Sequence, residues 1–137
     1  GHRYFSKAGH DSAPGTAAEP RKTISLAGMT NGQVAVVGAG DYPTFGTVTQ
    51  SVTIQGDGKP ILRGGSFTNT SDAVGWPIDV EIIGCSWTKV AGTNILRSLR
   101  SIIRNSTFIV RSVASCNDAL FIASAVTIGS TGTTQQC

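Results

Sequence analysis

Charged side chains are scarce in this chain of 137 residues, where Asp, Glu, Lys and Arg make up 14% and the net charge is +3. A nucleic-acid interface needs clustered Lys and Arg with stacking aromatics. The nearest candidates are Arg97, Arg100, Arg104 and Arg111. Arg100 falls one repeat after Asp79, so a cross-strand ion pair explains it better. We expect no nucleic-acid partner.

Long apolar runs are also missing. No stretch approaches the roughly 18 apolar residues of a membrane span, so we expect no membrane partner. Residues 1–7 lack the apolar core of a signal peptide. They also lack Met, so we expect a processed, trimmed or engineered start, and a secreted protein stays open as an alternative.

Metal-binding side chains are few and scattered. The three cysteines, Cys85, Cys116 and Cys137, form no Cys-x-x-Cys pair, and the two histidines, His2 and His10, lie far from them. This spacing argues against a zinc site. We favour free buried thiols, with a Cys85–Cys116 disulfide as the alternative.

The eight acidic residues give little support for hydrolytic or lyase chemistry. A glycosidase needs two carboxylates facing a sugar, and a calcium-dependent lyase needs several acidic ligands on neighbouring strands. The second arrangement is represented by only three residues, which are Asp79, Glu81 and Arg100. A surface ion pair is the simpler interpretation of these residues. No Gly-x-Ser-x-Gly elbow occurs. We expect no catalytic residue, no metal and no cofactor.

A period-two pattern is what the chain does contain. Five segments place apolar residues at alternate positions and then a small or polar residue, at 34–38, 52–56, 80–84, 101–105 and 126–130. The central positions are separated by 18, 28, 21 and 25 residues. Alternation that recurs about once per coil is typical of a solenoid. We therefore predict an all-β fold, a short right-handed parallel β-helix of about five coils with variable loops.

The alternation also predicts which side chains fill the interior. One interior column contains Val36, Ile54, Ile82, Ile103 and Ile128. A second contains Val34, Val52, Val80 and Val126, with Ser101 as the exception. Trp87 and Phe108 each lie five residues after the central position of their segment, so we expect these two aromatics to stack in the core.

The first 31 residues follow a different pattern, with a short strand, a polar loop and a brief turn or helix. The loop contains Gly9, Asp11, Gly15, Thr16, Pro20, Thr23 and Ile24. This series resembles the N-terminal segment of right-handed parallel β-helix proteins of the pectin-lyase-like family, in which a Gly-x-Asp-x-x-x-Gly-Thr loop precedes Pro and a Thr-Ile pair. Asn31-Gly32, Gly40-Asp41-Tyr42 and Val52 to Gly58 resemble the family elements that follow.

The resemblance implies the fold and is nearly silent on activity, because the family ranges from pectate lyases and polysaccharide epimerases to phage tailspikes and virion decoration proteins. The chain departs from the family pattern in one respect, because Gly28 shortens the helix expected after Ile24. We expect a capping segment at 1–31 and coils at 32–137 within one domain.

Three outward positions are unexpectedly apolar. By the alternation Val37, Ile83 and Ile102 face outward, where a solvated sheet would carry polar residues. Exposed apolar groups mark partner interfaces. The alternative is that segment 66–78 of the same chain covers them.

The sequence thus favours a structural or interaction protein attached to a larger assembly, most simply a homotrimer in a virion, as a capsid decoration or tailspike-like protein. Residues 130–137 contain no apolar side chain except Cys137, so we expect either a longer β-helix or a partner chain at this end. The alternative is a fragment of a carbohydrate-active enzyme or a polysaccharide-binding module, which leaves a polysaccharide contact open.

Overall fold

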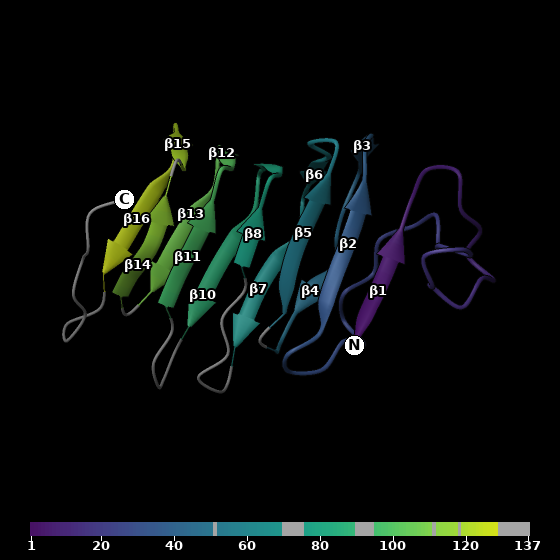
Figure 1. Ribbon diagram of the computed structural model, residues 1–137. Coiled ribbons are helices and arrows are strands. Elements are labelled where there is room, and N and C mark those ends of the chain that lie inside the picture. The colour runs from purple at the N-terminus through teal and green to yellow at the C-terminus, as the bar shows by residue number, and fades with distance from the viewer. Residues whose placement is uncertain (51, 70–75, 90–94, 111, 118, 129–137) are drawn as a thin grey trace.

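The chain forms a mostly β structure of parallel sheets (Figure 1). The structure is a computed structural model and describes residues 1–50, 52–69, 76–89, 95–110, 112–117 and 119–128. No α-helix is present among these residues. In the described part of the chain, no helix is long and apolar enough to cross a membrane.

Sixteen strands lie in three parallel sheets, which we call A, B and C. Sheet A contains β1 (His2–Phe5), β2 (Val34–Gly38), β5 (Thr53–Asp57), β8 (Trp76–Ile78), β11 (Ile95–Leu99) and β14 (Ser112–Asn117). Sheet B contains β3 (Asp41–Tyr42), β6 (Ile61–Arg63), β9 (Glu81–Ile83), β12 (Ile102–Arg104) and β15 (Leu120–Ile122). Sheet C contains β4 (Thr47–Val48), β7 (Ser66–Asn69), β10 (Ser86–Lys89), β13 (Thr107–Val110) and β16 (Ala125–Ile128).

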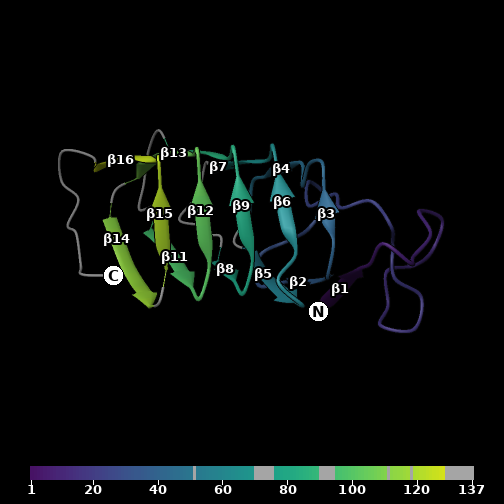
Figure 2. The same cartoon turned by 90° about the horizontal axis from the view of Figure 1, so that it is seen from above.

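From β2 onward the chain visits sheets A, B and C in this order five times. Each strand therefore pairs with the strand three elements later, and Figure 2 shows the strands of sheet B side by side along the molecule. The inner residues of sheet B are paired in register and separated by 20, 20, 21 and 18 residues: Tyr42, Leu62, Ile82, Ile103 and Phe121. The repeat is thus more regular than the sequence pattern indicated.

The predicted alignment of the five segments is wrong in register. Segments 34–38 and 52–56 lie in sheet A, segments 80–84 and 101–105 centre on sheet B, and segment 126–130 begins in sheet C. Ile54 consequently pairs with Ala35 and Pro77, whereas Ile82 pairs with Leu62 and Ile103. Alternation alone cannot tell one sheet from another, because a strand in any of the three presents the same period of two.

The side chains predicted for the core are confirmed in part. Val52, Ile54, Val80, Ile82 and Ile103 are buried, each at most 1% exposed. The side chains of Trp87, Phe108, Val126 and Ile128 lie outside the described residues, although the backbones of Trp87 and Phe108 are paired in register as expected.

The prediction for β2 is reversed. Val34 and Val36 are only half-buried, whereas Ala35 and Val37 are fully buried. Four consecutive apolar residues fit either face of a strand, and the chain uses the alternate pair, which places Val37 in the core rather than on an outward interface.

Left-handed residues flank the strands of sheet B. Before them come Lys59, Asp79 and Arg100, with φ of 55°, 55° and 47°. After them come Gly64, Gly84, Asn105 and Ala123, with φ of 62°, 69°, 51° and 48°. The bends predicted at Gly84 and Asn105 are confirmed. Gly38 and Gly56, which the same pattern placed at bends, lie within strands β2 and β5.

Residues of the N-terminal segment cover the outer edge of β1. Tyr4 N–H donates to the Gly15 carbonyl at 2.9 Å, Arg21 N–H to the Tyr4 carbonyl at 3.0 Å, and Ser6 N–H to the Arg21 carbonyl at 2.8 Å. Further along, Ile24, Leu26 and Met29 are buried. The segment thereby satisfies the backbone groups of an edge strand and extends the hydrophobic core to this end of the molecule.

Candidate interaction surface

The outer face of sheet B carries apolar and charged side chains in two rows. The first row runs across the paired strands through Asp41, Ile61, Glu81, Ile102 and Leu120. The second contains Arg63, Ile83, Arg104 and Ile122. The isoleucines are half-buried, and Leu120 is 53% exposed. We call these nine residues the sheet B face.

The charged residues of the sheet B face are paired with one another along diagonals. Arg63 donates to both carboxylate oxygens of Asp41, at 2.8 and 3.0 Å, and this contact lowers the pKa of Asp41. Arg104 Nε donates to Glu81 Oε1 at 2.7 Å. Each charge of the sheet B face is thus matched within the face, and its remaining side chains are apolar.

Two of the three predicted interface residues lie on this face. Ile83 on β9 is in register with Arg104, and Ile102 on β12 is in register with Glu81. The two isoleucines therefore occupy one diagonal of this strand pair, and the Glu81–Arg104 ion pair occupies the other. Val37, the third candidate, is 0% exposed and belongs to the core.

The described parts of segment 66–78 do not lie in sheet B. Residues 66–69 form β7 in sheet C, and residues 76–78 form β8 in sheet A. Residues 70–75 of that segment lie outside the described residues. The predicted cover of the apolar patch by this segment therefore finds no support from β7 and β8.

Sheet A presents a second apolar outer surface, which the sequence pattern missed. Tyr4, Val34, Val36 and Ile78 are half-buried there. Tyr4, Val36 and Ile78 belong to one row of the ladder, in which the polar Gln55 lies between Val36 and Ile78. The Tyr4 ring stacks on His2, with the ring centroids 6.2 Å apart. Correct assignment of the β2 register from sequence would have revealed this surface.

Asp79 sits in the bend between sheets A and B, at the centre of a network of four side chains. Arg100 donates to both of its carboxylate oxygens, Lys59 Nζ lies 3.5 Å from Oδ1, and Gln55 Nε2 donates to Oδ2 at 3.3 Å. The bond from Arg100 is the main reason that the pKa of Asp79 falls to about 2.

The three residues considered for lyase chemistry are thus divided between two ion pairs. Asp79 binds Arg100, and Glu81 binds Arg104. No group of three or more His, Cys, Asp or Glu side chains that could hold a metal lies together within the described ranges. Each of the two carboxylates accepts hydrogen bonds from a guanidinium group.

The thiol of Cys85 is free and only 3% exposed. Burial raises its pKa to about 12, so it stays protonated near neutral pH. The favoured prediction of a free buried thiol is confirmed for Cys85, which forms no disulfide with Cys116. The side chain of Cys116 and all of Cys137 lie outside the described residues.

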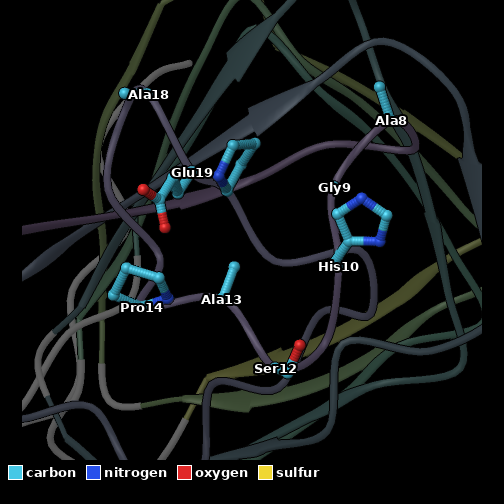
Figure 3. Close-up of a pocket in the computed structure, with 9 residues that line it drawn as sticks. Ala8, Gly9, His10, Ser12, Ala13, Pro14, Ala18 and Glu19 are labelled. Atoms are coloured by element: carbon cyan, nitrogen blue, oxygen red, sulfur yellow. The ribbon is translucent and has the colours of Figure 1, made fainter.

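The N-terminal loop lines an open hollow of about 480 Å³, and Figure 3 shows the residues around it. His10, Ser12 and Glu19 supply its polar side chains, and all three are exposed. The carboxylate of the neighbouring Asp11 already has partners outside the hollow. It accepts hydrogen bonds from the backbone N–H and the hydroxyl of Thr23, at 2.7 and 2.9 Å. The hollow is an open surface feature that lacks a buried polar group to define a ligand.

Comparison of the chain with family models, with curated proteins and with solved structures found no match. Membership of the pectin-lyase-like family therefore stays a prediction from the residues quoted above.

Proposed function

We propose that this chain is a structural or interaction protein, built as a right-handed parallel β-helix of five coils and attached to a larger assembly. Five passes through the three sheets in constant order support the β-helix. A virion, in which the chain acts as a decoration or tailspike-like subunit, is the setting that the family resemblance favours.

One observation carries the proposal: apolar side chains stand on the outer sheet B face, and the charges beside them are already paired. Ile83 and Ile102 flank the Glu81–Arg104 ion pair, and Leu120 continues the apolar surface at 53% exposure. Protein interfaces combine an apolar centre with matched polar groups.

The size of the face indicates how it associates. Five strands about 4.8 Å apart and two rows of side chains cover roughly 24 by 10 Å, well below the ~800 Å² per partner of a standard stable interface. Association therefore requires the apolar surface of sheet A as well. Contact between sheet A of one copy and sheet B of the next would close into a ring, and we propose a trimer.

Variants of the sheet B face test this proposal by sedimentation velocity. Ile83→Lys combined with Ile102→Lys should keep the fold and shift the protein to the monomer, because two charges would be buried without partners. Thr107→Lys is the matched control, since Thr107 is exposed on sheet C, and it should leave association unchanged. Equal sedimentation of the double variant and the wild type would contradict the proposal.

A further inference from the structure

An exposed turn with Asn31 and Gly32 at its centre connects the N-terminal segment to β2. Gln33 N–H donates to the Thr30 carbonyl at 3.2 Å, and Thr30 N–H donates to Gln33 Oε1 at 2.8 Å. These two hydrogen bonds close the turn. Asn31 and Gly32 are both exposed, and Gly32 has a φ of 83°, a left-handed value that glycine adopts without strain.

An asparagine followed by a glycine has a reaction of its own. The backbone nitrogen of Gly32 is a nucleophile beside the side-chain amide of Asn31, and its attack on Cγ closes a five-membered succinimide ring. The N–Cγ bond forms, the Cγ–Nδ2 bond breaks, and Nδ2 takes the proton of the attacking nitrogen and leaves as ammonia. Water then opens the ring at either of its carbonyl carbons and leaves aspartate or isoaspartate. The reaction consumes only water and needs no oxidant or reductant.

The structure leaves this attack open at Asn31. Gly32 has no side chain to shield its nitrogen, and nothing lies within 4 Å of the position that a Cβ atom would occupy there. Gly32 N–H donates no hydrogen bond to any residue that the structure describes, so its nitrogen can attack without first breaking one. Water reaches the ring because both residues are exposed.

Asn105 provides a comparison within the same molecule. It is also exposed and left-handed, with a φ of 51°. The residue that follows it, Ser106, is only 2% exposed, and Ser106 N–H donates to the Ser124 hydroxyl at 3.2 Å. Ring closure at Asn105 must break this bond and move a buried stretch of backbone. Folding should therefore protect Asn105 and leave Asn31 unprotected.

We propose that Asn31 is a site of spontaneous modification in the folded protein, where it becomes aspartate and isoaspartate through a succinimide. The new carboxylate lowers the net charge of +3 by one. Isoaspartate also routes the main chain through its Cβ atom, which lengthens the path between Thr30 and Gln33 and weakens the turn that they close. Because β2 pairs with β1 and β5, the modification loosens the junction between the N-terminal segment and the first coil. The proposal does not depend on association through sheets A and B.

Peptide mass spectrometry of the 137-residue chain tests the proposal after incubation in warm, mildly alkaline buffer, with and without urea that unfolds the protein. The rate at Asn31 should differ little between the two states. Folding should slow the rate at Asn105 by about tenfold or more, since its reaction must also break the bond to Ser124. Each site is compared with itself, so the intrinsic difference between a following glycine and a following serine cancels.

Two variants complete the experiment. Asn31→Gln should abolish isoaspartate at this position, because glutamine must close a larger and slower six-membered ring. Asn31→Asp carries the same new charge on an unlengthened main chain, so the isoaspartate form, purified by ion exchange, should melt at a lower temperature than Asn31→Asp.

Protection of Asn31 by folding to the same degree as Asn105 would overturn the proposed site, and this result needs no variant to fold. Equal melting temperatures of the isoaspartate form and Asn31→Asp would overturn the proposed loosening of the junction.

Discussion

Arg100 donates two hydrogen bonds to the carboxylate of Asp79, from Nε at 2.8 Å and from Nη2 at 3.0 Å. The two residues are 21 positions apart in sequence and occupy equivalent left-handed bends of neighbouring repeats, with φ of 47° and 55°. This cross-repeat ion pair is the contact that the sequence alignment anticipated, and it ties one bend to the next.

The pair makes stability depend on acid pH. The pKa of Asp79 falls from 3.8 to about 2 on folding, so its contribution is present above the unfolded value and is lost as the pH falls toward the folded value. Asp79→Asn should lower the free energy of unfolding by at most about 1 kcal/mol at pH 7. It should also reduce the loss of that free energy as the pH falls from the unfolded pKa toward the folded pKa. Urea unfolding at several pH values measures both effects.

Asp57→Asn is the control for this prediction, because Asp57 is an exposed carboxylate on β5 that makes no ion pair within the described ranges. An unchanged acid transition in Asp79→Asn would show that the ion pair does not contribute to folding.

The core register predicts opposite results at two adjacent isoleucines. Ile82 is 1% exposed, so Ile82→Asp should unfold the domain by burying an unpaired charge. Ile83 is half-buried on the outer face, so Ile83→Asp should leave the fold intact. Thermal unfolding compares them. Similar stability of the two variants would show that the register of β9 is wrong.

Deletion of core volume gives a graded test at the neighbouring strand. Ile103 is 0% exposed and pairs with Ile82. Ile103→Ala should therefore cost roughly 2–5 kcal/mol of unfolding free energy, measured by urea denaturation. A loss below about 1 kcal/mol would contradict close packing at this position.

Gly56 is required for close backbone approach. A Cβ atom there would collide with the backbone oxygen of Asp79 and lie 2.8 Å from Cδ of Pro60. Gly56→Ala should destabilise the protein by about 1–3 kcal/mol. Gly28→Ala, where nothing lies within 4 Å of the added atom, should be nearly neutral. Equal melting temperatures for the two variants would contradict the predicted contact.

Because Cys85 is buried, its thiol should react slowly with alkylating reagents. Its pKa of about 12 keeps the reactive thiolate scarce, so iodoacetamide should leave Cys85 unmodified in the folded protein and modify it after unfolding. Mass spectrometry of peptides separates Cys85 from the other two cysteines. Rapid labelling of Cys85 in the native protein would show that the site is open.

The sequence predicted the kind of fold better than its register. Alternation around Ile82 and Ile103 identified buried strands because small or polar residues follow them closely at Gly84 and Asn105. The four apolar residues 34–37 are also followed by a small residue, Gly38, but they fit either face of a strand, and their inner face is decided by packing against β1 and β5. Assignment of strands to three sheets needed the regular spacing of Tyr42, Leu62 and Ile82, which lies outside the pattern first recognised.

The candidate surface was predictable to a similar degree. Ile83 and Ile102 stand out because apolar residues occupy outward positions next to buried ones. The Glu81–Arg104 ion pair beside them was not predicted. That pairing follows from the strand register and the reach of an arginine side chain along a diagonal, neither of which composition reveals.

Light scattering of the wild-type protein over a range of concentrations tests the central claim most directly. If the outer faces of sheets A and B associate, the molar mass should be a multiple of the 14.2 kDa chain, threefold for the proposed ring. A mass that stays at 14.2 kDa at every concentration, together with weak binding of a hydrophobic dye, would contradict it.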